Sequence, residues 1–121
     1  MLISITPLAA QDLEEIGDYI ALENASRAVE FLAELQSHCE IIRRNPEGYR
    51  QRLEFSQTMR SCTHGSYVIF FESNDSEVTI IRVLHGGRDL QALLKRGPSR
   101  GFFYWLSQSF IWLSQGYTLG L

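Results

Sequence analysis

The chain has 121 residues, enough for one hydrophobic core, and its hydrophobic content of 45% and charged content of 21% are typical of a folded domain. Its N-terminus has neither a basic leader nor a long apolar run, so we expect a cytoplasmic protein without a signal peptide or membrane anchor. Residues 1–94 contain eight arginines, no lysine and all 14 carboxylates, a net charge of −6, and the whole chain reaches −3. This acidic balance argues against a broad electrostatic grip on nucleic acid, and we expect no direct DNA binding by this chain alone.

The first predicted elements are a short strand over residues 2–5 and a helix over residues 7–23. Thr6 suits the N-cap of this helix, and Pro7 suits its first turn because the missing N–H has no helical partner there. The helix is amphipathic, since apolar residues recur at intervals of four, three and four: Ala9, Leu13, Ile16 and Ile20. The acidic residues lie away from this apolar stripe: Asp12, Glu14, Glu15 and Asp18.

A second helix is predicted over residues 26–45, with Ser26 as its N-cap and Pro46 as its stop, because the residue before a proline is pushed out of the helical region. The same apolar spacing recurs in it: Ala28, Leu32, Leu35, Cys39 and Ile42. The short break between the helices forces an antiparallel hairpin. Two apolar faces exceed what one hairpin can hide by itself, so we expect it to lie on a sheet.

Three further strands are predicted after the helices, over residues 59–62, 67–71 and 78–85. Residues 73–76 form the turn between the last two, because Ser, Asn and Asp side chains bond their own backbone in turns. The order strand, helix, helix, three strands predicts an α+β domain whose helical hairpin covers one face of a mainly antiparallel sheet.

The last strand runs into a group of cations bounded by glycines. Gly86 and Gly87 tolerate backbone angles that other residues resist, so the strand should end near His85. A period of two would divide its side chains between two faces: Ile81, Val83 and His85 on one, and Ile80, Arg82 and Leu84 on the other. Which of the two faces meets the helices stays open.

The cysteines Cys39 and Cys62 lack metal-ligand spacing. In a reducing compartment they would be free thiols, and each is best interpreted as a small buried hydrophobic residue. The sequence therefore predicts no metal site and no cofactor.

In its order of elements and in four of its segments, the chain resembles the ParE/RelE superfamily of bacterial toxin–antitoxin toxins, and the ParE branch most closely. The match spans about residues 3–94. The segments are AQDLEEIGDYIA at residues 10–21, Arg60-Ser61 before a turn, YVIFF at residues 67–71, and IRVLHGGRDL at residues 81–90. The resemblance implies a RelE/ParE-like toxin domain over residues 1–94 and leaves residues 95–121 as a C-terminal extension.

The resemblance also implies partners and a target. A ParE member would be neutralised by a cognate ParD-like antitoxin, would serve plasmid stabilisation, and would act as a DNA gyrase inhibitor. A RelE member would instead be a ribosome-dependent messenger RNA endoribonuclease. A degenerate, non-toxic relative is the third alternative. The acidic body and the lack of lysine in residues 1–94 favour gyrase inhibition by binding, with no catalytic residue assigned.

Five residues are candidates for contact with the target: Arg60, Tyr67, Arg82, His85 and Arg88. Arg60 and Arg82 look like the arginines that RelE-type nucleases use for phosphate and transition-state charge, but both also suit ion pairs with carboxylates. A histidine at a strand end can be a general acid or base, or a packed, hydrogen-bonded residue.

The remaining two candidates are also ambiguous. Tyr67 either packs on the sheet or offers its hydroxyl to a partner. Arg88 either fixes its loop together with Asp89, forms a catalytic pair with it, or faces the target. Arg43-Arg44 and Arg50–Arg52 make the densest basic group, which suits either a solvated helix end or an anionic partner.

The C-terminal extension is rich in aromatic residues and contains a repeat, FYWLSQ at residues 103–108 and FIWLSQ at residues 110–115. Ser, Gln and Gly dilute it too much for a convincing membrane span. Residues 102–121 therefore suggest self-association or contact with a membrane surface, or an extension without a selected function.

Overall fold

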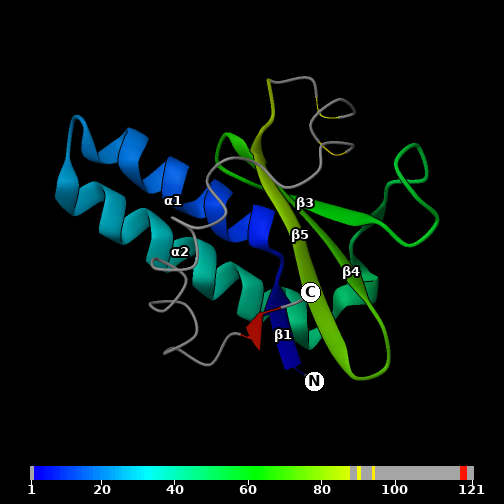
Figure 1. Cartoon of the computed structure of the whole chain (residues 1–121). Helices are drawn as coiled ribbons and strands as arrows, with labels where there is room; N and C mark the ends of the chain where they lie inside the picture. Colours follow the sequence, from blue (N-terminus) through cyan, green and yellow to red (C-terminus); the bar gives the residue numbers. More distant parts are fainter. Residues whose placement is uncertain (1, 88–89, 91–93, 95–117, 120–121) are drawn as a thin grey trace.

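The computed structural model describes residues 2–87, 90, 94 and 118–119. Within these residues, two helices form one layer and a six-stranded sheet forms the other (Figure 1). The helices are α1 (Pro7–Ala21) and α2 (Ala25–Arg44), and a short 3-10 turn, η1, covers Pro46–Gly48. The strands are β1 (Leu2–Ile5), β2 (Arg50–Gln51), β3 (Arg60–His64), β4 (Tyr67–Ser73), β5 (Glu77–His85) and β6 (Thr118–Leu119).

The sheet has the order β2-β3-β4-β5-β1-β6. The pairs from β2 to β5 are antiparallel, whereas β1 lies parallel to both β5 and β6. The α+β class, the helical hairpin and the mainly antiparallel sheet predicted from the sequence are confirmed. Because β1 is inserted beside β5, the chain's first strand and its longest strand are neighbours in the sheet.

The helix ends follow from their capping residues. Thr6 caps α1 as predicted, since its hydroxyl accepts a hydrogen bond from the Ala9 N–H at 3.1 Å. The prediction of Ser26 as the second cap is wrong: Asn24 caps α2, because its side-chain oxygen reaches the Arg27 N–H at 3.0 Å. The connection covers residues 22–24 in place of the expected 24–25, and both helices end slightly earlier than predicted.

The main core lies between the helices and the sheet. It is built from the apolar stripes of α1 and α2 and from inward-facing residues of β1, β4 and β5, with Leu35, Ile42, Ile69, Phe71 and Val78 fully buried. Gly17 lets the helices approach closely, because a Cβ at this position would lie 3.0 Å from Leu32 Cδ1. Cys39 is buried here and Cys62 packs at the margin, and both are free thiols.

The expected alternation along β5 is wrong. Ile80 and Val83 both belong to the helix-side core, whereas Ile81 and Leu84 both belong to a second cluster on the opposite face. The reason is an irregularity in the pairing with β4: Phe70 pairs with Arg82, but Phe71 pairs with Ile80, which leaves one extra residue in β5. Such a bulge changes the phase of the side chains beyond it.

The turns around the two hairpins depend on particular residues. Gly65 has a φ of 58°, a left-handed value that favours glycine, and it joins β3 to β4. Asn74 closes the β4–β5 turn by accepting from the Ser76 and Glu77 N–H groups. β5 ends at His85 as predicted, although Gly86 and Gly87 do not use positive φ angles.

Part of the predicted extension lies outside the described residues, including the aromatic repeat and the basic residues 95–100, and so does the Arg88-Asp89 pair at the end of the toxin domain. At the far end of the extension, β6 pairs in parallel with Ser4 and Ile5 of β1. None of the helices in the described part of the chain is long and apolar enough to cross a membrane.

Candidate functional site

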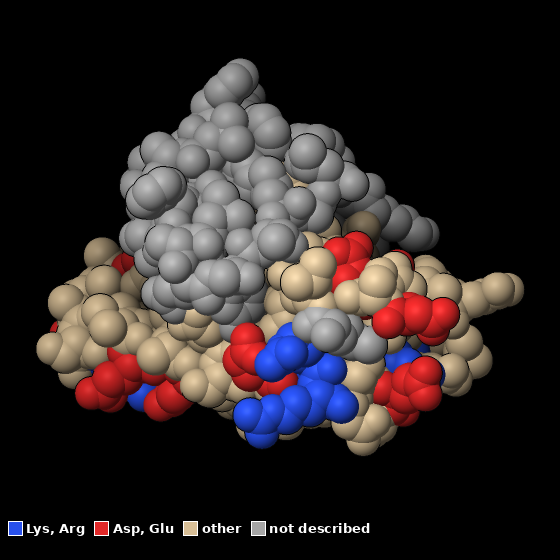
Figure 2. All heavy atoms as spheres, turned by 90° about the horizontal axis from the view of Figure 1, so that it is seen from below, with Lys and Arg blue, Asp and Glu red and all other residues tan. Residues whose placement is uncertain are grey.

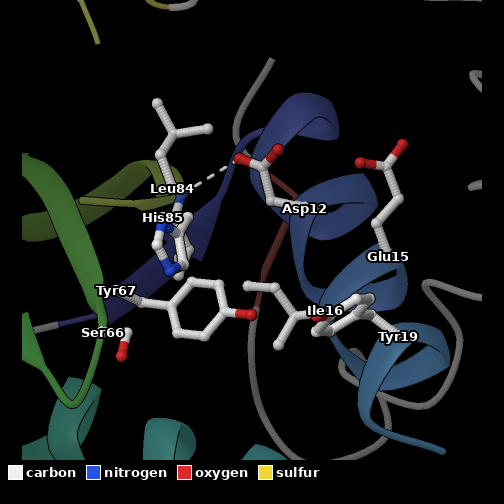
Figure 3. A pocket seen from close by; sticks show the side chains of 9 residues that line it. Asp12, Glu15, Ile16, Tyr19, Ser66, Tyr67, Leu84 and His85 are labelled. Carbon is white, nitrogen blue, oxygen red and sulfur yellow. Dashed lines mark hydrogen bonds between the residues drawn. The ribbon is translucent and has the colours of Figure 1, made fainter. Parts of the chain in front are cut away.

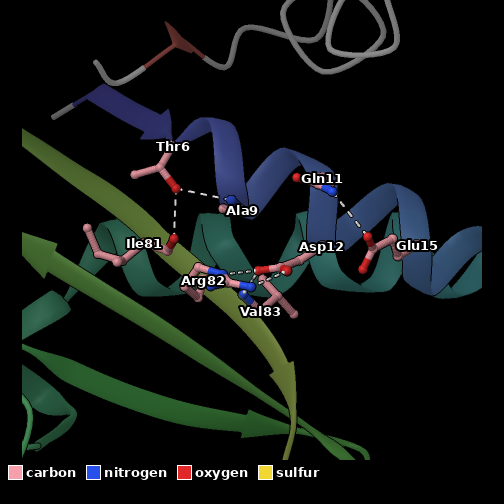
Figure 4. Close-up of polar contacts among 8 residues, drawn as sticks. All are labelled: Thr6, Ala9, Gln11, Asp12, Glu15, Ile81, Arg82 and Val83. Carbon is pink, nitrogen blue, oxygen red and sulfur yellow. Dashed lines mark hydrogen bonds and ion pairs between the residues drawn. The ribbon is translucent and has the colours of Figure 1, made fainter. Parts of the chain in front are cut away.

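The candidate site is built where α1 continues past the end of β1. β1 pairs with β5 only as far as Ile80, so the next part of that edge of β5 has no neighbouring strand among the described residues. Side chains from the N-terminal part of α1 and its cap bind the backbone of this part of β5. The Thr6 hydroxyl donates to the Ile81 carbonyl at 2.7 Å, and an Asp12 carboxylate oxygen accepts from the Val83 N–H at 3.0 Å (Figure 4). The helix therefore satisfies backbone groups that a strand would otherwise pair.

Asp12 also holds Arg82. The guanidinium Nε donates to Asp12 Oδ2 at 2.7 Å and Nη2 donates to Oδ1 at 2.9 Å, a bidentate pair (Figure 4). Asp12 is 6% exposed and Arg82 is 8% exposed. Burial raises the pKa of the Asp12 carboxyl above its ordinary value, while Arg82 and the Val83 N–H act in the opposite direction. All three contacts are donors to the carboxylate, which suits its ionised form.

A pocket of about 460 Å³ opens beside this pair, between α1 and the ends of β4 and β5 (Figure 3). Helix α1 supplies one wall, and the β3–β4 turn and the end of β5 supply the other. The lining residues are Asp12, Glu15, Ile16, Tyr19, Ser66, Tyr67, Val83, Leu84 and His85. The wall on α1 is acidic and aromatic, and no lysine or arginine is among the described residues that line the pocket.

Two of the predicted site residues, Tyr67 and His85, meet in this pocket. They are opposite each other in the β4–β5 ladder, and their rings make an edge-on contact with centroids 5.5 Å apart. In Figure 3 the Tyr67 hydroxyl points across the pocket toward Ile16. Burial raises the pKa of Tyr67, so its hydroxyl is a protonated donor at neutral pH. His85 is exposed, and its Nδ1 accepts from the Gly87 N–H at 3.1 Å.

The predicted arginines do not join them. Arg82 is engaged in the buried pair behind the pocket wall, which is the ion-pair alternative considered from the sequence. Arg60 lies on β3 and donates to the carbonyls of Tyr49 at 2.8 Å and Glu47 at 3.4 Å, outside the pocket lining. Arg88 lies outside the described residues.

The densest basic group is partly neutralised by its own neighbours. Arg43 pairs with Glu40 and Arg52 pairs with Glu54, each at 2.8 Å. On the face shown in Figure 2, the largest group of Arg side chains is bordered by carboxylates, and the smaller basic areas also lie among carboxylates. This face therefore lacks the broad positive surface that tight phosphate binding requires.

The arrangement suits binding better than catalysis. A nuclease needs cations and a proton-transfer pair aimed at one phosphate. Two of the three cations that the sequence offered, Arg60 and Arg82, are committed to different structural contacts, and the third lies outside the described residues. His85 faces an acidic and aromatic pocket. Apolar and acidic walls with a tyrosine hydroxyl can instead hold an apolar or cationic segment of a partner protein.

The sequence prediction missed the wall of the pocket on α1. Asp12 was placed on the polar side of the helix, but it is buried. Two signals indicate this position. Asp12 is three residues after Ala9 and four before Ile16, so it falls on the apolar stripe, and Arg82 is a single charge within a β-branched strand. A buried charge needs a partner of opposite charge, and Asp12 and Arg82 are partners for each other.

Comparison with known proteins places this geometry in context. The family model described as "ParE toxin of type II toxin-antitoxin system, parDE" matches residues 3–90. A solved structure titled "Chromosomal ParDE TA system from P. aeruginosa" is similar, with a TM-score of 0.61 and 20% sequence identity. That similarity covers 70% of this chain and 95% of the other. No curated protein matches the chain.

Proposed function

Because the chain belongs to the ParE toxin family of type II toxin–antitoxin systems, we propose that it is a toxin that inhibits DNA gyrase by binding and is neutralised by a cognate ParD-like antitoxin. It acts in the cytoplasm, where gyrase is found. It does not cleave messenger RNA.

The observation that carries this proposal is the chemistry of the pocket between α1 and β5. Its described lining contains Asp12 and Glu15 but no lysine or arginine. Arg60 and Arg82, the two candidates for stabilising phosphate charge, point to separate partners, the 47–49 backbone and Asp12. An RNA phosphate would meet negative charge here, whereas a protein segment with apolar and basic side chains would find complementary groups.

The same pocket is proposed as a contact site for a partner protein. Tyr67 supplies a hydroxyl donor, Tyr19 supplies exposed aromatic surface, and Glu15 supplies an exposed carboxylate at the rim of the pocket. Such a mixture, with an aromatic residue near the centre and charge at the edge, is typical of protein–protein contacts.

Two assays on the full-length protein test the mechanism. One measures supercoiling by purified gyrase with added toxin, and the other maps messenger RNA ends by primer extension after brief expression. We expect lost supercoiling and intact messages. Message cleavage at codon-related positions with gyrase unaffected would replace this proposal by a RelE-like endoribonuclease, and unaffected growth on expression would indicate a degenerate relative.

Matched variants locate the contact surface. Glu15→Arg reverses charge at the pocket rim and should weaken binding to gyrase or to the antitoxin, because it places a cation where a partner cation is expected. Glu23→Arg makes the same change on an exposed residue outside the pocket lining and should leave binding unchanged. Equal affinities for the two variants would show that the pocket is not part of the contact surface.

A further inference from the structure

All three histidines of the chain belong to one row of aromatic rings. The contacts run from His38 to His64, then to Phe31, Tyr67 and His85, with neighbouring ring centroids 5.2, 5.4, 5.5 and 5.5 Å apart. The row begins on α2, crosses the β3–β4 hairpin and ends in the pocket between α1 and β5. A displacement of the His38 ring can therefore reach Tyr67 through direct contacts between neighbouring rings.

The first contact in this row is a hydrogen bond between two imidazoles. His38 Nδ1 and His64 Nδ1 lie 2.9 Å apart, so one nitrogen donates and the other accepts. This bond links the middle of α2 to the end of β3. Only one of the two Nδ1 atoms can carry a proton in this bond. If both carried one, two N–H groups and two positive charges would face each other at this distance.

The groups around the two rings favour the arrangement with one proton between the two Nδ1 atoms. The Glu34 carboxylate lies 3.7 Å from His64 Nε2, so a positive charge on His64 is stabilised and its Nδ1–H can donate to His38. The other nitrogen of His38, Nε2, lies 3.6 Å from the Cys62 sulfur. The charged and titratable groups around the pair are Glu30 and Glu34 on α2 and Cys62 on β3. One contact further away, Arg27 pairs with Glu34 and Tyr67 packs on Phe31.

The pair is better suited to a proton than to a metal ion. The Glu34 carboxylate and the Cys62 sulfur approach the outer nitrogens of the two rings, Nε2, and not the facing Nδ1 atoms. Within the described residues, no group of three His, Cys, Asp or Glu side chains is arranged to hold a metal ion.

We propose that the His38–His64 hydrogen bond is an acid-sensitive link between α2 and the β3–β4 hairpin, and that protonation of both rings opens it and loosens the support of Tyr67. Because Tyr67 lines the pocket, acidification should also loosen that wall. This acid-sensitive link does not depend on which partner the pocket binds.

The direction of the pH dependence follows from His38. Burial, and then the positive charge of His64, lower the pKa of His38 below its ordinary value of about 6.5. An unfolded histidine therefore takes up its proton at a higher pH than folded His38 does. The contribution of His38 to stability is fully present above the pKa of an unfolded histidine, and it is lost as the pH falls toward the lower pKa of folded His38. Glu34, whose pKa is lowered chiefly by Arg27, stays ionised through this range.

The first test follows the imidazole nitrogens of the full chain by ¹⁵N NMR between about pH 8 and pH 5. We expect the signals of His38 and His64 to shift together and His38 to take up its proton only below the range of a free imidazole. Independent titration of the two rings, each like a free imidazole, would overturn the proposal.

The second test compares thermal unfolding midpoints at about pH 7.5 and pH 5.5. The wild type should lose several degrees on acidification, and His38→Gln, which cannot take up the second proton, should lose clearly less. His85→Gln is the matched control at the other end of the ring row and should keep the wild-type loss. An equal loss in wild type and His38→Gln would contradict the proposal, and if His38→Gln does not fold, the NMR titration of the wild type decides.

Discussion

The two faces of the sheet are covered in different ways. On the helix side, α1 and α2 bury a continuous core that includes Leu35, Phe71 and Val78. On the opposite face, a small cluster has four buried members, Met59, Val68, Phe70 and Leu84, with half-buried Phe55, Ile81, Leu90 and Leu94 around them. The first face is closed by two helices, whereas the described cover of the second comes from residues before β3 and from Leu90 and Leu94 after β5.

Part of the cover of the second face comes from the irregular segment between β2 and β3. On the second face Phe55 stands edge-on to Phe70, with ring centroids 5.4 Å apart. The Arg52 guanidinium lies over both rings, 4.9 Å from the Phe55 centroid and 5.5 Å from that of Phe70. An arginine stem and its cation thus replace part of the cover that a helix gives on the other side. The helix-covered face should therefore tolerate substitution least.

The largest expected effect is at the join between α1 and β5. Asp12→Ala leaves the Arg82 guanidinium buried without its carboxylate and the Val83 N–H without its acceptor, which should cost about 3–5 kcal/mol. Urea titration measures the loss. Asp18→Ala, on an exposed position of the same helix, is the control and should change stability little. A small loss at Asp12 would mean that solvent reaches the Arg82 pair.

The next effect tests the core of the helix-covered face. Leu35 is fully buried, so Leu35→Ala should cost about 2–5 kcal/mol through lost burial and a cavity. Leu32 is half-buried against Gly17, and Leu32→Ala should cost less because solvent can fill part of the space. Calorimetric unfolding of both variants gives the comparison. Losses below about 0.5 kcal/mol at both positions would contradict the packing of the hairpin on the sheet.

A smaller effect is expected on the opposite face. Phe55→Ala removes the ring that covers Phe70 and lies under Arg52, and it should cost about 1 kcal/mol because Phe55 is only half-buried. Leu53→Ala, at an exposed position of the same segment, should be nearly neutral. If Phe55→Ala destabilises the protein as much as Leu35→Ala in the same titration, the two faces are equally important and the comparison fails.

The smallest effect is expected from truncation after Leu94. This change keeps Leu90 and Leu94 in the second cluster and, within the described residues, removes only the two-residue pairing of β6 with β1. The shortened chain should unfold cooperatively, with a loss below about 1 kcal/mol. Denaturant titration tests stability, and size-exclusion chromatography tests whether residues 102–121 drive self-association. A truncated chain without a cooperative transition would place the extension in the core.

The sequence by itself determined the two helices, four of the strands and their layers, whereas the two-residue strands β2 and β6 were not predicted. The four-three spacing in α1 and α2, the Thr6-Pro7 start and the β-branched residues of β5 act over a few neighbouring residues, so their effects can be read locally. The placement of the hairpin on the sheet also followed, because two apolar stripes need a common cover. Resemblance to a family added the expectation of a toxin, which neither spacing nor composition supplies.

Only the tertiary structure decided what the charged residues do. Asp12 and Arg82 are 70 positions apart, and their pairing depends on β1 ending at Ile5, opposite Ile80 of β5, and on the bulge beside Phe71. Neither feature has a local signature strong enough to predict, since each arises from the pairing of strands that are distant in the chain. The same holds for His38 and His64, which meet because α2 packs against the end of β3. Local propensity selects the elements, whereas long-range register determines which side chains they bring together.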